Sequence, residues 1–195
     1  MASPTPAARR EGHQPAWVGR MEAKRVSADE ALSHLESGMR VYVHPGCGEP
    51  EALVEAMMRR GPKLKDVEIV HLLTLGSAPY AEPEWEGHFR HRALFTGRNV
   101  RQAVREGRAD FVPIFLSEIP GLFLDGFLPL DIALIQVSPP DEHGFCSFGV
   151  GVECTLAAAQ TAKRVIAQVN EHMPRVHGDN FIHVNRIDHI VEDTR

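Results

Sequence analysis

The chain has 195 residues, of which 43% are hydrophobic and 24% are charged, and its formal net charge is -5. This length fits one sizeable core and is too short for two large ones. The acidic balance and the scattered basic residues exclude non-specific nucleic-acid binding, and no apolar run approaches the ~20 residues that cross a bilayer. The length predicts a single domain. Three cysteines argue against a disulfide framework, so we expect the protein in the reducing cytoplasm.

The first part of the chain has the composition of a tail. Residues 1–20 are rich in Ala, Pro and Arg and show no periodicity, which predicts disorder there and a folded domain over residues 21–195. Ser27 followed by Glu30 has the spacing of a capping box and predicts a helix that ends at Gly38.

The remaining pattern alternates apolar strands with short helices. Strands are expected at 39–43, 67–73, 93–95, 110–112, 132–137, 163–169, 181–184 and 187–191, and helices at 51–60, 99–106 and 153–162. Loops are expected at 74–89 and 117–130. This rhythm predicts an α/β fold with an open, mostly parallel sheet flanked by helices.

Two glycine-rich turns follow predicted strands. The first is His44 to Pro50, reading HPGCGEP, and the second runs from Ser138 to Gly151. Backbone N–H groups and side chains converge at such strand ends, where open α/β sheets bind ligands. The first turn lacks the third glycine of a dinucleotide fingerprint and the Gly-Lys-Ser/Thr of a Walker loop, so a plain tight turn is the alternative interpretation.

Two other kinds of chemistry fit the sequence poorly. His177, His183 and His189 recur every six residues, which is not the spacing of a zinc site, so no metal is predicted. Cys47 lies at a helix N-terminus but has no identifiable base, and no serine lies in a Gly-x-Ser-x-Gly elbow.

Four separated motifs resemble those of a known family. HPGCGEP, GRADFVPIFLSEIP, SPPDEHGFCSFGVGVE and AKRVIAQVNEHMP are similar in order and spacing to the acetyl-CoA hydrolase/transferase family, which includes 4-hydroxybutyrate CoA-transferase. The resemblance implies a class I CoA-transferase fold, related to that of sugar-phosphate isomerases. It also implies transfer of CoA from a thioester to a carboxylate through an enzyme-bound glutamyl-CoA.

The resemblance also implies what this chain lacks. In the family the catalytic glutamate belongs to a C-terminal domain, beyond Arg195, so no catalytic residue is assigned here and the chain alone is expected to be inactive. Glu49 and Glu153 are interpreted as carboxylates that complement helix N-termini. The expected partners are coenzyme A, as an acyl-CoA substrate, a short carboxylic acid, and a C-terminal domain or subunit.

The two turns are hypothesised to form the N-domain side of the acyl or carboxylate pocket. The residues assigned to it are Gly46, Cys47, Gly48, Ser138, Pro139, Pro140, Asp141, Gly144 and Gly149. A rigid interdomain hinge is the alternative for the second turn. A non-catalytic acyl-binding, CoA-binding or partner-binding module and an acetyl-CoA hydrolase remain open. A sugar-phosphate isomerase is disfavoured because no basic residue is near either turn in the sequence.

The absent second half predicts exposed apolar surface. The loops that carry Phe123 and Phe127, and those that carry Tyr80 and Trp85, are the expected positions. We expect such a surface to make the isolated chain self-associate, for example as a homo-oligomer.

Overall fold

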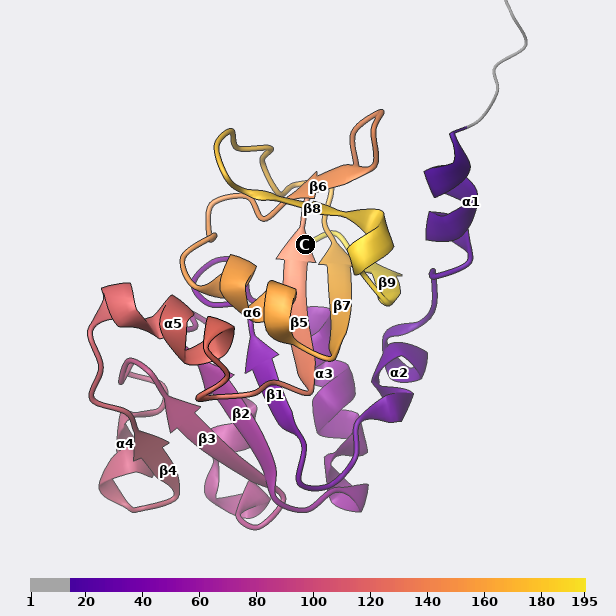
Figure 1. Ribbon diagram of the computed structural model, residues 1–195. Coiled ribbons are helices and arrows are strands. Elements are labelled where there is room, and N and C mark those ends of the chain that lie inside the picture. Colours follow the sequence, from indigo (N-terminus) through magenta and orange to yellow (C-terminus); the bar gives the residue numbers. More distant parts are fainter. Residues whose placement is uncertain (1–14) are drawn as a thin grey trace, which may run out of the picture.

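The computed structural model describes residues 15–195, and its centre is a seven-stranded parallel sheet (Figure 1). The strand order is β4-β3-β2-β1-β5-β7-β9. The bounds are β1 (Arg40–Val43), β2 (Val67–His71), β3 (Phe89–Ala93), β4 (Ala109–Phe111), β5 (Ile132–Val137), β7 (Arg164–Val169) and β9 (His189–Glu192). A separate antiparallel pair joins β6 (Phe145–Ser147) to β8 (Phe181–His183). The predicted α/β fold class is confirmed.

The order of the strands creates a switch point in the middle of the sheet. The first strand is β1; the following strands β2, β3 and β4 are added outward on one side of it, and the chain then returns to place β5 on its other side. β1 and β5 are therefore neighbours whose following loops turn to different parts of the molecule. In open α/β sheets this is the position where a crevice forms.

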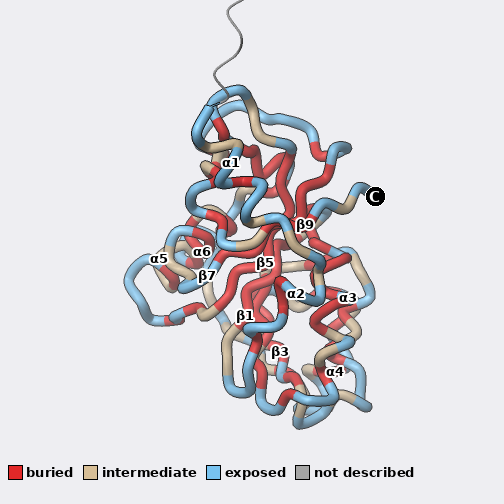
Figure 2. Tube along the Cα trace, turned by 90° about the vertical axis from the view of Figure 1, so that its right-hand side faces the viewer, coloured by how far each residue is buried: buried red, intermediate tan, exposed pale blue. Residues whose placement is uncertain are grey.

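Helices cover both faces of the sheet. The helices are α1 (Ala16–Glu22), α2 (Ala28–Ala31), α3 (Glu51–Arg60), α4 (Arg101–Arg105), α5 (Ile119–Leu124) and α6 (Thr155–Thr161). Side chains alternate along β5, so Ala133 and Ile135 pack in the core with α5 and α6, whereas Ile132 and Leu134 pack in the core with α2, α3 and α4. Figure 2 shows this buried interior along β1 and β5.

The chain before residue 27 differs in part from the predicted tail. Residues 1–14 lie outside the described residues, but residues 16–20 belong to α1, so an irregular tail does not extend to residue 20. Trp17 of this helix donates to the carbonyl oxygen of Glu142 at 3.2 Å, and Met21 is buried. A long-range contact that periodicity does not reveal holds this short helix.

Four elements were displaced, missed or shorter than expected. β3 begins at Phe89, whereas the predicted strand began at Ala93. The prediction was displaced because the charged Arg90 and Arg92 are not typical of a strand; in the structure they pair with Asp110 and Glu68 at 2.6 and 2.8 Å. Helix α5 lies within the predicted 117–130 loop, and β6 lies within the second glycine-rich turn. The helix expected from Ser27 to Ser37 is one α-turn, α2, and a 3-10 turn, although Ser27 Oγ does accept the Glu30 N–H.

The exposed apolar residues are only partly those expected. Phe127 is 77% exposed, but Phe123 and Tyr80 are buried and Trp85 is intermediate. Other large exposed hydrophobic side chains include Leu75, Phe95, Phe111, Phe115, Leu116 and Leu124. None of the helices in residues 15–195 has the length and apolarity to cross a membrane.

Candidate functional site

The candidate site lies where β1, β2 and β5 end at the same edge of the sheet. Val43 is paired with Leu134, and Tyr42 with Val70, so the three strands are in adjacent parallel register. The segments that follow are residues 44–50, 72–78 and 138–153. These are the loops next to the switch point between β1 and β5, which a ligand of this fold type would contact.

The turn after β1 leaves part of its backbone accessible. Gly46 has a φ of +62°, which favours glycine, and its N–H donates to the carbonyl oxygen of Leu73 at 2.5 Å. Cys47 is exposed at the tip of the turn. Within residues 15–195, the N–H groups of Cys47 and Gly151 have no hydrogen-bond acceptor. Cys47 is exposed, whereas Gly151 is buried. Unpaired N–H donors are the kind of group that stabilises an oxyanion.

His44 holds this turn to the segment that follows β5. The imidazole is fully buried; its Nδ1 accepts the N–H of Gln136 at 3.2 Å, and its Nε2 contacts the carbonyl oxygen of Gly151. The first contact requires an unprotonated Nδ1, so Nε2 carries the proton and donates. Burial lowers the pKa of His44 to about 4. A neutral histidine therefore brings Gly48 and Gly151 against one ring.

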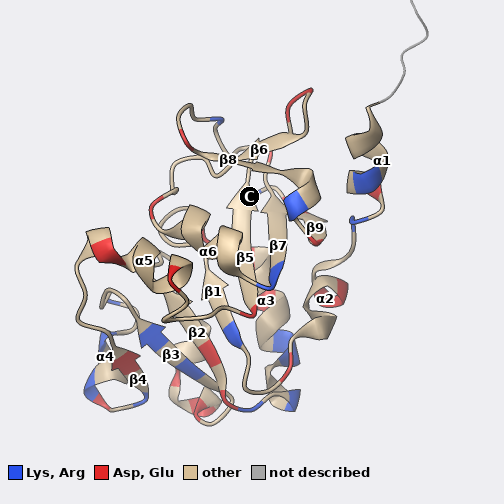
Figure 3. Ribbon diagram, in the orientation of Figure 1, with Lys and Arg blue, Asp and Glu red and all other residues tan. Residues whose placement is uncertain are grey.

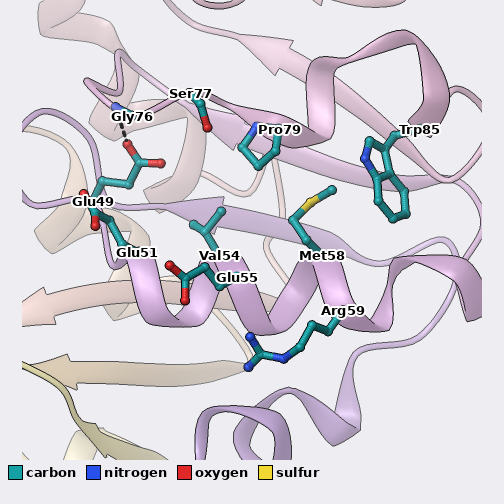
Figure 4. Close-up of a pocket in the computed structure, with 10 residues that line it drawn as sticks. All are labelled: Glu49, Glu51, Val54, Glu55, Met58, Arg59, Gly76, Ser77, Pro79 and Trp85. Atoms are coloured by element: carbon teal, nitrogen blue, oxygen red, sulfur yellow. Dashed lines mark hydrogen bonds between the residues drawn. The ribbon is translucent and has the colours of Figure 1, made fainter.

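Glu49 joins the turn after β1 to the loop after β2. Its side chain Oε2 accepts the N–H of Gly76 at 2.8 Å, and burial raises its pKa. Figure 4 shows this carboxylate at one end of a pocket of about 610 Å³, with Trp85 at the other. The lining residues are Glu49, Glu51, Val54, Glu55, Met58, Arg59, Gly76, Ser77, Pro79 and Trp85.

Buried amide side chains support the same turn from β5 and β7. Gln136 Nε2 donates to the backbone carbonyl of Glu49 at 2.9 Å, and Asn170 Nδ2 donates to Gln136 Oε1 at 2.6 Å. Gln168 Oε1 accepts the N–H of Ala52 in the first turn of α3. The sequence analysis missed these residues. The available signal was a polar residue inside each of two otherwise apolar strands, at equivalent register positions.

The first part of the segment after β5 makes most of its hydrogen bonds internally. Ser138 Oγ accepts the N–H of Ser147 at 2.9 Å, and Asp141 Oδ1 accepts the N–H groups of His143 and Phe145, both at 2.9 Å. Arg175 donates to Asp141 Oδ2 at 2.6 Å. These contacts build a turn that begins β6.

The predicted site residues therefore fall into two groups. Gly46, Cys47 and Gly48 lie at the switch point, beside Gly151. Pro139 and Pro140 line a hollow next to α1, and Gly144 packs against Trp17, while Gly149 lies against Met173 with its carbonyl accepting from Asn180. Ser138 and Asp141 belong to this second group through the contacts given above.

The charges and thiols around the site are unevenly distributed. Figure 3 shows basic residues along β3 and at the starts of β1 and β7, away from the carboxyl edge. Arg175, remote in sequence, nevertheless reaches Asp141, so the second turn does have a basic neighbour. Burial raises the pKa of Cys146 to about 12 and that of Cys154 to about 11, which leaves Cys47 as the accessible thiol.

No metal centre is evident in the described part of the chain. Residues 15–195 contain no group of three His, Cys, Asp or Glu side chains arranged to hold an ion. His183 Nε2 instead contacts the His143 carbonyl, and His189 stacks on His34 with ring centroids 5.4 Å apart.

Comparisons with known proteins give a consistent result. The family model for the acetyl-CoA hydrolase/transferase N-terminal domain matches residues 12–195. The chain is 47% identical over 176 residues to the 4-hydroxybutyrate coenzyme A transferase of Clostridium kluyveri, covering 90% of this chain and 41% of that protein. It is 44% identical over 171 residues to the succinyl-CoA:acetate/propanoyl-CoA:succinate CoA transferase of Fasciola hepatica, covering 87% and 35%.

Solved structures show the same relationship. The 4-hydroxybutyrate CoA-transferase of Porphyromonas gingivalis superposes with a TM-score of 0.77 at 34% identity, over 92% of this chain and 41% of that one. RipA from Yersinia pestis superposes with a TM-score of 0.87 at 26% identity, over 93% and 44%. The chain thus spans less than half the length of these relatives. It belongs to the acetyl-CoA hydrolase/transferase family and corresponds to the N-terminal domain of that family.

Proposed function

We propose that this chain is the N-terminal half of a CoA-transferase that moves CoA between an acyl-CoA thioester and a short carboxylic acid. The observation that carries the proposal is the meeting of the Gly46-Cys47-Gly48 turn with Gly151 at the switch point, where the N–H groups of Cys47 and Gly151 are among those without an acceptor in residues 15–195. The names of the relatives supply the reaction class. Coenzyme A enters as part of the substrate.

The proposed contribution of this half is stabilisation of negative charge. Attack of a carboxylate on a thioester places charge on the carbonyl oxygen of a tetrahedral intermediate, and positioned N–H donors stabilise that charge. We assign this role to the N–H groups of Cys47 and Gly151, which have no acceptor within residues 15–195. The carboxylate nucleophile is assigned to the C-terminal domain, as the family resemblance implies, so no glutamate of this chain takes that role.

The predicted site residues share this work unequally in the proposal. Gly46, Cys47 and Gly48 form the surface that faces substrate. Ser138, Pro139, Pro140, Asp141, Gly144 and Gly149 form the supporting segment that sets the path of the chain into Gly151. The hydrogen bonds of Ser138 and Asp141 to nearby backbone N–H groups support this division.

A further domain is the proposed partner at the exposed apolar surface. Leu72, Leu94, Ile114 and Ile119 line an apolar hollow of about 420 Å³ beside the exposed Phe115. Contiguous apolar surface of this kind is characteristic of an interface. The greater length of the relatives supports a C-terminal domain as its occupant.

The test is CoA transfer by the chain joined to a C-terminal domain. The chain is produced with the C-terminal domain of its Clostridium kluyveri relative, and acyl-CoA products from acetyl-CoA and 4-hydroxybutyrate are separated by chromatography. Release of free CoA without transfer would identify a hydrolase instead. A folded complex that catalyses neither reaction would contradict the proposal and favour a binding module.

The exposed thiol offers a matched second test. N-Ethylmaleimide should modify Cys47 first, because Cys146 and Cys154 are buried. Modification should block transfer in the wild-type complex by placing a bulky group at the tip of the turn. The Cys47→Ser complex should be active and insensitive to the reagent. Full activity of the Cys47-modified wild type would place the site elsewhere.

A further inference from the structure

Within residues 15–195, Glu49 is a buried carboxyl group without a cationic partner of the kind its neighbours have. Glu51 and Glu55 on the same helix pair with Arg195, at 3.5 and 2.6 Å. Glu49 is only 8% exposed and instead accepts the backbone N–H of Gly76. Burying a carboxyl group is costly unless specific contacts compensate. Its burial without an ion pair is therefore best explained by what it does between two loops of the candidate site.

The fit between Glu49 and Gly76 is tight. A Cβ at position 76 would lie 2.5 Å from Glu49 Oε2 and 2.8 Å from the carboxyl carbon. Figure 4 shows the carboxylate directed at the Gly76 N–H along the hydrogen bond of 2.8 Å. A glycine at this position lets the carboxylate reach the backbone itself.

The loop around Gly76 is held from its other side by Asn99. The Nδ2 of Asn99 donates to the Gly76 carbonyl at 2.8 Å and to Thr74 Oγ1 at 3.1 Å. Thr74 in turn forms a parallel bridge with Gly46. Two side chains therefore hold this loop, and Glu49 is the one that belongs to the first glycine turn.

The backbone of Glu49 is itself immobilised. Its carbonyl oxygen accepts from Gln136, which is held by Asn170. A movement of the Gly76 loop would thus be resisted by a chain of buried contacts that begins in β5 and β7. Well-supported groups of this kind keep reacting atoms in place, and small displacements reduce rates strongly.

We propose that Glu49 is a positioning residue, whose carboxylate fixes the Gly76 backbone and thereby sets the loop after β2 beside the Gly46-Cys47-Gly48 turn. This inference rests on the proposed function for its kinetic consequence, but its structural part can be tested without activity. Glu49 acts by accepting a hydrogen bond, so a neutral acceptor of the same shape should replace it.

The structural test is hydrogen exchange of the Gly76 amide. Exchange should be slow in the wild type, remain within about threefold of that rate in Glu49→Gln, and accelerate by tenfold or more in Glu49→Ala. Glu51→Gln is the matched control, because Glu51 is an exposed glutamate two residues further on, at the start of α3, and its replacement should leave Gly76 unchanged. Unchanged protection in Glu49→Ala would overturn the proposal.

The kinetic test uses the two-domain complex and separates kcat from KM. Glu49→Ala should lower kcat by about tenfold or more with a smaller change in KM, whereas Glu49→Gln should keep kcat within about threefold. If Glu49→Gln loses as much as Glu49→Ala, the charge itself acts and the positioning role is wrong. An inactive wild-type complex would contradict the proposed function instead, and the exchange measurement would still decide the hydrogen bond.

A second variant guards against a Glu49→Ala protein that does not fold. Gly76→Ala should lower kcat comparably, because the new Cβ displaces the carboxylate. The double variant Glu49→Ala/Gly76→Ala should be no worse than the more impaired single variant, since both remove the same contact. Fully additive losses, or an undiminished kcat in Gly76→Ala, would overturn the proposal.

Discussion

The turn after β1 and the segment after β5 have similar compositions and different structures. Both are rich in glycine and proline, and both follow a buried central strand. In the first, Cys47 is exposed and its N–H has no acceptor within residues 15–195. In the second, Ser138 and Asp141 accept nearby N–H groups and build the start of β6. Residue types alone do not distinguish an exposed turn tip from a self-supporting segment; the local hydrogen bonds of residues 138–147 do.

The reason lies in what each segment must satisfy. Buried backbone groups require partners, and a long segment that leaves the sheet has to supply many of them locally. The seven-residue turn from His44 to Pro50 instead relies on neighbouring elements, through His44, Glu49 and Gln136. Its short path leaves the tip free for a ligand.

The largest expected difference between the two regions is in their response to acid. The pKa of His44 is about 4 in the folded protein, against 6.5 ordinarily, so the unfolded chain binds the extra proton first. Stability should fall as pH drops from 6.5 to 4, by about 1.4 kcal/mol per pH unit for this group. In urea unfolding of His44→Gln, the free energy of unfolding should depend on pH less steeply by this amount between pH 6.5 and 4. An unchanged slope would contradict a neutral buried His44.

The matched control is in the other region. Burial raises the pKa of Asp141, but the N–H groups of Phe145 and His143 and the nearby Arg175 outweigh it and hold that pKa below its ordinary value. The stabilisation from a lowered carboxyl pKa is present above the unfolded value of 3.8 and is lost as pH falls through the folded one. Asp141→Asn should therefore change the slope only below about pH 4.

The next expected effect is from adding a methyl group to the first turn. A Cβ at Gly48 would overlap the buried His44 ring, so Gly48→Ala should lower the free energy of unfolding by about 2 kcal/mol. In Gly46→Ala the added Cβ would meet no atom within 4 Å. Only the φ of +62° is then unfavourable, and it should lower the free energy of unfolding by about 1 kcal/mol. Denaturant unfolding would measure both. Equal losses would show that packing on His44 is not the constraint.

The smallest effect on CoA transfer is expected at Ser138. Ser138→Ala leaves the buried N–H of Ser147 without its acceptor and should cost about 1–2 kcal/mol of unfolding free energy. The kcat for CoA transfer by the folded complex should change little, because this segment supports the turn rather than facing substrate. The exposed Ser77→Ala is the control, with a change within about 0.5 kcal/mol. A large loss of kcat with unchanged stability would instead place Ser138 at the substrate.

Local sequence patterns predicted the central elements well. Helix α3, Glu51–Arg60, and strand β5, Ile132–Val137, have the expected bounds, because a long helical period and an uninterrupted apolar run are strong local signals. β3 was displaced because charged residues occupy its exposed positions and are neutralised only by neighbouring strands. β6 was missed because three residues between glycines carry little periodicity.

By itself, the sequence determined the family, the alternation of strands with helices, and the two glycine turns. Only the tertiary structure decided which groups those turns meet: Gly76 for Glu49, Gln136 for His44, and Arg175 for Asp141. Turn chemistry and periodicity are local properties, so one chain displays them directly. Contacts between distant residues depend on strand order, and the return of the chain to place β5 beside β1 creates the switch point where these residues meet.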